Sequence, residues 1–279
     1  MTMKNNNIFC LFIALLLSQQ SFAGFPLGRG GYQVIPTYNF YKATSYWDKN
    51  RVLQTSGFGN FTSNYFSIYG GFGINRDLDF IYNVPYVVQR SISPTGVTAQ
   101  TPGLGDATLG LCYYLNHYDN YKHLSFTGSL IVPLYQNVTE PYIGFQSTGL
   151  EGKLGLAGNS QMSIRNAYYD MEVGVRQYMS VQGPTQFFTN ITGGKQLNDQ
   201  WKMSGTFSGV VSNSSTASSV NLSSSSITLN RDFEYWRFTI NAGYILNANT
   251  TIWGSLFKDV AGRNTGQGSG LALFLVYKL

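Results

Sequence analysis

The chain has 279 residues, a formal net charge of +5, and charged side chains at only 11% of its positions. Lysine and arginine do not occur in runs, so we expect no nucleic-acid partner. Aromatic residues make up 15% of the chain, with 20 Tyr and 19 Phe beside 31 Gly. Beyond residue 23, no apolar stretch approaches the roughly 18 residues that a transmembrane helix needs.

The first 23 residues have the pattern of a secretory signal peptide. Lys4 precedes an apolar run at 8–17, and Ser21 and Ala23 supply the small residues of a cleavage site. The run is too short to span a bilayer as a helix. We therefore predict a cleaved signal peptide at 1–23 and a mature domain at 24–279.

Removal of that peptide leaves Cys112 as the one cysteine of the mature chain, because Cys10 lies in the apolar run. An intramolecular disulfide and a zinc site with two thiolates are therefore excluded. The stability of an exported domain of this size must come from hydrogen bonding and burial.

Next along the chain, apolar and polar residues alternate with a period of two in many segments. Leu78, Phe80 and Tyr82, for example, alternate with Asp79 and Ile81. Each segment has one apolar face and one small or polar face, as in a half-buried strand. We predict twelve strands, although ten to fourteen are compatible with the pattern around 148–182: 31–42, 60–73, 78–90, 106–116, 122–134, 148–158, 168–180, 185–196, 200–212, 232–246, 250–261 and 269–279.

The stretch GLGDATLGLCYYL, residues 103–115, tests this interpretation. Its first glycines resemble a phosphate-binding loop, but Thr108 stands where the third glycine of a dinucleotide motif would be. No helix-forming stretch follows. Leu109, Leu111 and Tyr113 instead share one face, so the stretch is predicted to be a strand.

The connections between strands alternate in length. Short turn signals occur at 75–77, 116–120, 198–199 and 247–249, and longer Gly/Ser/Pro-rich connections at 43–59, 91–105, 135–150 and 212–226. This rhythm is typical of a transmembrane barrel with periplasmic turns and external loops. The predicted fold is therefore all-β, a transmembrane antiparallel up-and-down β-barrel.

Tyr and Trp residues near the ends of these strands fit the interfacial girdles of such a barrel, where an apolar ring with a polar tip is favoured. We expect membrane anchoring rather than ligand contact from the following set: Trp47, Tyr65, Tyr69, Tyr86, Tyr113, Trp201, Tyr235, Trp236, Trp253 and Tyr277.

The final ten residues, 270–279, form an amphipathic strand with Leu271, Leu273 and Tyr277 on one face. This pattern resembles the sorting signal of bacterial outer-membrane barrels, although those usually end in Phe rather than Leu279. The resemblance implies that the barrel-assembly machinery of a Gram-negative bacterium is a partner.

The polar faces of the strands contribute charges that are predicted to line the lumen: Asp79, Asp106, Glu172, Arg176, Lys202 and Arg237. Paired across a narrow lumen they would plug it, whereas unpaired along an open path they would select solutes. For Asp106, a structural role at the start of its strand is favoured over ligand contact. Residues 24–31 are flexible enough to enter the lumen.

Catalysis is not expected from this chain. His117 and His123 fall at a predicted short turn and are interpreted as solvated. Neither belongs to the constellation that a hydrolase or a metal site would need. Cys112 is interpreted as a small space-filling residue on the lumen side. We expect no metal and no cofactor.

A family resemblance enters at Gly103, Gly105 and Asp106. Together with 69–75 before them and Gly262-Arg263-Asn264 near the end, these residues resemble an outer-membrane family known as the meta-pathway phenol degradation proteins. The resemblance implies an outer-membrane barrel that passively takes up hydrophobic or aromatic compounds. The family name reflects degradation pathways and implies no chemistry by the barrel itself.

Three functions therefore remain open. The first is a passive channel for small hydrophobic or aromatic molecules in the bacterial outer membrane. The second is a structural or adhesive barrel whose lumen is closed by paired charges. The third is an enzyme or an exported soluble β-sandwich, which would bury its apolar faces against each other and extract without detergent.

Overall fold

The computed structural model describes residues 10–11, 25–55, 59–93, 95–118, 122–160, 167–214, 228–229 and 231–279. The predicted signal peptide therefore lies outside the described residues, apart from Cys10 and Leu11. Most of the Ser-rich stretch at 212–226 lies outside them as well. None of the described residues belongs to a helix long and apolar enough to cross a membrane.

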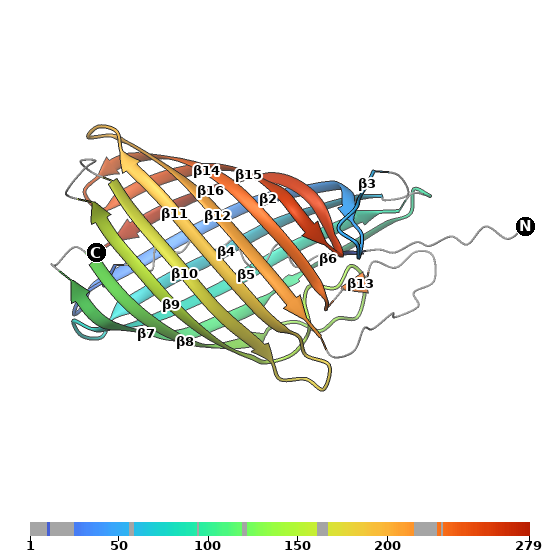
Figure 1. Cartoon of the computed structure of the whole chain (residues 1–279), viewed down its shortest axis with the longest axis horizontal. Coiled ribbons are helices and arrows are strands. Elements are labelled where there is room, and N and C mark those ends of the chain that lie inside the picture. The colour runs from blue at the N-terminus through green and yellow to red at the C-terminus, as the bar shows by residue number, and fades with distance from the viewer. Residues whose placement is uncertain are drawn as a thin grey trace, which may run out of the picture.

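Twelve strands of the described residues form a closed antiparallel barrel whose strands run obliquely to its long axis (Figure 1). They are β2 (Tyr32–Trp47), β4 (Asn60–Gly73), β5 (Leu78–Ile92), β7 (Asp106–Tyr118), β8 (Lys122–Pro133), β9 (Gly149–Ser160), β10 (Ala167–Tyr178), β11 (Thr185–Gln196), β12 (Trp201–Asn213), β14 (Phe233–Asn247), β15 (Thr250–Arg263) and β16 (Thr265–Lys278). The predicted all-β barrel of twelve strands is thus confirmed.

Four shorter strands complete the set: β1 (Cys10–Leu11), β3 (Leu53–Gln54), β6 (Thr98–Leu104) and β13 (Thr228–Leu229). β3, β6 and β13 lie at the end of the barrel away from the C-terminus (Figure 1). We call this the long-loop end, and the opposite end the short-turn end.

The barrel closes where β16 pairs with β2, from Thr265↔Trp47 to Lys278↔Gln33. Closure removes the free edges that a sheet in lipid could not tolerate. The pairs opposite Pro36 are missing from this ladder, because proline has no N–H to donate. Near Pro36, the backbone groups of Tyr32 and Leu279 exchange two hydrogen bonds and join the start of β2 to the end of β16.

The alternation of the sequence sets which side chains face outward. Leu109, Leu111 and Tyr113 of β7 are exposed on the outer wall, whereas Thr108 and Cys112 are buried inside the barrel. The other strands repeat this pattern, because successive side chains of a strand point to opposite faces. The interpretation of residues 103–115 as strand rather than phosphate loop therefore holds from Asp106 onward.

Two connections differ from the prediction. Residues 98–104, expected within a loop, form β6, which pairs with β5 from Ile92↔Thr98 to Tyr86↔Leu104. The final strand begins at Thr265 rather than at 269, because Asn264 turns the chain with φ of 50° directly after Arg263. Asparagine tolerates this left-handed conformation better than most residues do.

The ladder of β5 changes partner at Pro85. Before Pro85 in the chain, β5 pairs with β7 as far as Asn83↔Thr108. After Pro85, β5 pairs with β6 from Tyr86↔Leu104 onward. The Pro85 carbonyl still accepts a 2.9 Å hydrogen bond from the Gly105 N–H. Because β8 ends at Pro133, β6 extends beyond β8 at the long-loop end.

Candidate functional site: the lumen

Apolar side chains cross the lumen toward the long-loop end. The buried cluster comprises Tyr41, Ala43, Phe61, Tyr65, Val87, Ile131, Phe145, Tyr178, Val210, Phe233, Tyr235 and Phe257, with Phe188 packed against it. We call this set the lumen cluster. Its members come from strands all around the barrel, so they meet across the interior. Membrane barrels usually have a polar interior, so a cluster of aromatic side chains inside this barrel is a departure from the common pattern.

Charged residues surround this cluster in pairs. The Arg176 Nε donates to Glu151 Oε2 at 2.9 Å, and the Arg237 Nε donates to Asp259 Oδ1 at 2.7 Å. The Lys153 Nζ lies 3.4 Å from Glu172 Oε1. Each pair joins adjacent strands and is almost completely buried. Such burial is tolerated because each charge has an opposite partner.

The pair on β14 and β15 also contacts the lumen cluster. The Tyr41 hydroxyl donates to Asp259 Oδ2 at 2.9 Å, and the Arg237 guanidinium carbon lies 4.3 Å from the centre of the Phe257 ring. These contacts hold the Arg237 side chain across the lumen beside the aromatic rings. The charges therefore stiffen the constriction.

The segment 25–31 lies inside the barrel near the short-turn end. The Leu27 N–H donates to Asp79 Oδ2 at 3.1 Å, and the Phe25 ring lies 5.6 Å from that of His123. Gly30 and Gly73 are joined backbone to backbone by a 2.8 Å hydrogen bond. The segment thus narrows the lumen before β2 begins, as its flexible composition allowed.

The connection from 134 to 148 folds into the mouth of the lumen at the long-loop end. The Phe145 ring lies 4.8 Å from that of Tyr178, edge to face. The Tyr135 hydroxyl donates to the Asp106 carboxylate and receives the Gln146 N–H at 3.0 Å. Burial and the negative charge of Asp106 raise the pKa of Tyr135 well above its usual value, so this phenol remains a donor. We call residues 134–148 the mouth loop.

The mouth loop also contacts β6. The Thr101 Oγ1 lies 3.3 Å from the Thr139 carbonyl oxygen and 3.5 Å from the Thr139 Oγ1. At Gly103, an added Cβ would lie 2.6 Å from the Ile143 side chain, so glycine permits this close approach. The loop therefore packs against β6 and against the lumen cluster at once.

The residues predicted to line the lumen all lie on inward-facing positions. Asp79, Asp106, Glu172, Arg176 and Arg237 are buried, and Lys202 is half-buried near the short-turn end of β12. Three of the six, Glu172, Arg176 and Arg237, join ion pairs with partners that the sequence analysis had not named: Lys153, Glu151 and Asp259. Whether any of the six contacts a solute stays a prediction.

Asp106 lies in a hydrogen-bonded environment at the start of β7. Its Oδ2 accepts the Tyr178 hydroxyl at 3.4 Å as well as the hydroxyl of Tyr135. Two tyrosine hydroxyls therefore donate to this carboxylate, and the positive charge of Arg176 acts on it as well. The carboxylate joins the mouth loop to β10 at the start of β7.

The second motif of the family resemblance forms a clamp at the long-loop end. Arg263 binds Asp232 through two nitrogens, at 2.7 and 3.1 Å. The Asn264 N–H donates to the Asp48 carbonyl, and the Asn264 side chain donates to the Asp232 carbonyl at 2.9 Å. The turn between β15 and β16 is thus tied to the ends of β2 and β14.

The histidine interpretation is wrong for His123. This residue lies on β8, and its ring is buried against Tyr114 and Phe25 rather than solvated. β8 begins at Lys122, so position 123 already belongs to the strand and falls on its inward face. The side chain of His117 lies outside the described residues. Among the described residues, no group of three or more His, Cys, Asp and Glu side chains could hold a metal ion.

The aromatic prediction is correct for part of the set. Tyr86, Tyr113, Trp201 and Tyr277 are exposed on the outer wall. It is wrong for Trp47, Tyr65, Tyr235 and Trp253, which are buried inside the barrel. Tyr69 also points inward and packs against a second buried cluster of Ile35, Trp253, Phe274 and Val276. The direction in which each of these rings points follows from whether its position is odd or even along the strand, and not from how near it lies to the strand end.

Solved structures share this architecture. An outer-membrane channel from Pseudomonas putida F1 has a TM-score of 0.72 at 14% identity, covering 93% of this chain and 98% of that one. The fold is that of an outer-membrane β-barrel. The β-domain of the Bordetella autotransporter BrkA has a TM-score of 0.53 at 10% identity, covering 90% of this chain and 100% of that one.

The NanC porin has a TM-score of 0.51 at 6% identity, covering 89% of this chain and 100% of that one. At these identities the likeness establishes the fold and leaves function to be argued from the lumen. No family model matches the chain, and no curated protein matches it.

Proposed function

We propose that this chain is an outer-membrane barrel that acts as a passive channel for small hydrophobic or aromatic compounds. The observation that carries this proposal is the lumen cluster, an aromatic constriction inside a membrane barrel. A hydrated polar solute would have to lose its water to pass these rings, whereas an apolar solute gains contact with them. The structural likeness to an outer-membrane channel supports the same function.

The proposed route runs between the mouth loop and β6. This boundary is held by side-chain contacts such as Thr101 with Thr139 rather than by a strand ladder. Outward movement of the loop would withdraw Phe145 from the lumen cluster and expose the remaining rings to solutes. The change of ladder partner at Pro85 adds a weak point in the wall near the same place.

A disulfide lock tests this route. We expect that Thr101→Cys with Thr139→Cys forms a disulfide, because the two hydroxyl oxygens already lie 3.5 Å apart. The oxidised barrel should lose uptake of an aromatic hydrocarbon, measured with labelled solute in whole cells, and reduction should restore it. Each single cysteine variant is the matched control. Unchanged uptake in the oxidised double variant would reject this route.

The alternative is a structural or adhesive barrel, and one observation favours it. Glu151, Arg176, Arg237 and Asp259 are paired and buried, so these charges fill the lumen rather than line an open path. A barrel of this kind would transport neither polar nor apolar solutes, even with the mouth loop unlocked. The uptake assay therefore separates the two functions.

Several narrower assignments belong to the same proposal. We infer that the chain is related to the meta-pathway phenol degradation proteins. The resemblance rests on Gly103, Gly105 and Asp106 and on the Arg263 clamp. We infer export by a cleaved signal peptide at 1–23, assembly through β16, and outer-membrane insertion with the long loops outside. Protease protection of the long-loop end in intact cells would contradict that orientation.

A further inference from the structure

Three basic side chains form one row on the outer wall near the long-loop end. Lys258 of β15 and Lys42 of β2 both pair with Ser269 of β16, while Lys42 and Arg90 of β5 both pair with Thr62 of β4. All three basic side chains are exposed. Neighbouring strands lie about 4.8 Å apart, so adjacent cations of the row are separated by roughly 10 Å at the backbone.

No ion pair offsets this row among the described residues: none of their carboxylates lies within 4.0 Å of the three cationic groups. The acidic residue nearest in sequence, Asp259, points inward to Arg237. In the described strands, the other exposed outward-facing cations, Lys122 and Lys195, lie at the short-turn end. Positive charge on the long-loop side of the wall is therefore concentrated over one sector.

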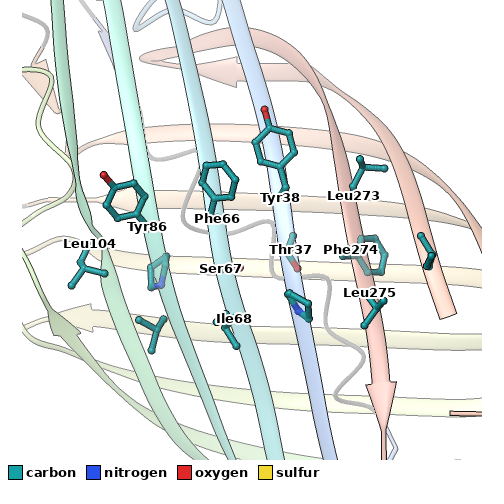
Figure 2. A pocket seen from close by; sticks show the side chains of 14 residues that line it. Thr37, Tyr38, Phe66, Ser67, Ile68, Tyr86, Leu104, Leu273, Phe274 and Leu275 are labelled. Atoms are coloured by element: carbon teal, nitrogen blue, oxygen red, sulfur yellow. The ribbon is translucent and has the colours of Figure 1, made fainter. Parts of the chain in front are cut away.

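An apolar groove of about 640 Å³ crosses the same sector (Figure 2). Its upper wall is a register-paired row on β16, β2, β4, β5 and β6: Leu273, Tyr38, Phe66, Tyr86 and Leu104. Its lower wall lies two residues nearer the short-turn end on each strand and includes Leu275, Ile68 and Val84. Inward-pointing Thr37 and Ser67 leave only backbone at its floor.

The upper wall is held away from the groove by specific contacts. The Tyr38 hydroxyl donates to Asn64 Oδ1 at 2.8 Å, and the Tyr38 ring lies 4.8 Å from that of Phe66. Figure 2 shows the hydroxyl groups of Tyr38 and Tyr86 directed away from Ile68 and Leu275. These contacts keep the rings from closing the groove, so the hollow is a built feature of the wall.

The groove and the basic row are in register. Lys42 lies four positions after Tyr38 on β2, and Arg90 lies four positions after Tyr86 on β5. At about 3.3 Å per residue the cations lie roughly 13 Å from the upper wall, on the side of the long loops. A molecule with an anionic head and an apolar chain would match both features at once.

We propose that this sector binds one lipopolysaccharide molecule of the surrounding leaflet. Its phosphates lie against Lys258, Lys42 and Arg90, and an acyl chain lies in the groove. Phosphates and basic side chains form charge-assisted hydrogen bonds, and burial of the chain adds apolar contact. The inference rests on the proposed outer-membrane orientation, which places the long loops in the leaflet that contains this lipid.

The test measures binding of purified lipid A to the detergent-folded barrel by native mass spectrometry. The triple variant Lys42→Gln, Arg90→Gln, Lys258→Gln should bind about 100-fold more weakly, because each basic side chain at an anionic lipid surface contributes about a factor of five. The double variant Lys122→Gln, Lys195→Gln is the control and should bind normally. Equal loss in both variants, or no loss in the triple variant, would overturn the proposal.

A second variant addresses the groove and a competing occupant. Val84→Trp should fill the groove and weaken binding of lipid A while leaving binding of its fully deacylated sugar phosphate unchanged. Dimerisation of the wild-type barrel that Val84→Trp abolishes, without any effect on lipid A binding, would assign the groove to a second copy instead. Solute uptake is measured separately, so a barrel that binds lipid A but transports nothing would reject the channel and keep this site.

Discussion

At the scale of single residues, the lumen is defined by charges that are buried with their partners. Glu151 and Arg176 face each other across β9 and β10, and both are nearly inaccessible to solvent. A pair of this kind adds little net stability relative to apolar residues of similar size, but removal of one member leaves a buried charge without compensation. The pair can therefore be tested by comparing single and double variants.

We predict that Arg176→Met destabilises the barrel by about 3–5 kcal/mol, because Glu151 is left buried and unpaired. The double variant Arg176→Met, Glu151→Leu should recover most of that loss. Urea unfolding of the barrel in lipid vesicles, followed by tryptophan fluorescence, measures both. If the double variant were as unstable as the single one, the loss of stability would not come from an unpaired Glu151, and the prediction would be wrong.

A second residue-scale prediction concerns Gly73. A Cβ at this position would lie 1.7 Å from the Gly28 carbonyl oxygen, so Gly73→Ala cannot keep the segment 25–31 in place. Displacement of the segment should open the hollow that Phe25, Leu27 and Cys112 line together, so Cys112 should react faster with a water-soluble maleimide in the folded barrel. Gly254→Ala, where the nearest atom lies at 3.7 Å, is the control and should react like the wild type. Equal reaction rates in both variants would mean that the segment does not cover this part of the lumen.

At the scale of elements, the strands could be predicted because period-two alternation and turn residues are local signals. The inward direction of Trp253 was not predicted, because a large aromatic residue near a strand end suggested a membrane girdle. Trp253 in fact shares a strand face with Phe257 and Asp259. Since a carboxylate is expected to point into the lumen, Asp259 would have placed every second residue of β15, including Trp253 and Phe257, on the inward face. β6 was missed because its pairing with β5 depends on where Pro85 ends the ladder to β7, which is a long-range property.

The clamp at Arg263 gives an element-scale prediction. Arg263→Met removes both Arg263 bonds to Asp232 and leaves the bond from the Asn264 side chain, so the chain before β14 should be held less firmly to the turn between β15 and β16. We expect faster proteolysis near residue 232 with little change in global stability, because ion pairs near the surface contribute only about 0–1 kcal/mol. Limited proteolysis with mass mapping provides the measurement. Arg51→Met, whose side chain is far more exposed, is the comparison. Identical cleavage patterns in the two variants would argue against a clamp.

At the scale of the whole molecule, the barrel combines an apolar outer wall, a lumen blocked by aromatic rings, and two segments folded inward from its two ends. Alternation in the sequence predicted the wall and five of the ten charged residues that are buried in the described strands. It could not predict that Tyr41, Tyr178 and Phe257 meet across the lumen, because barrel closure brings together positions far apart in the chain. The proposed route past these rings depends on that closure.

Uptake of a labelled aromatic hydrocarbon, compared with a polar solute of similar size, tests the central claim most directly. Cells that express the wild-type barrel should take up the aromatic compound faster than cells without it, with no gain for the polar solute. Oxidised Thr101→Cys, Thr139→Cys should abolish the gain until it is reduced. Equal gain for both solutes, or no gain for either, would contradict an aromatic constriction that passes apolar compounds.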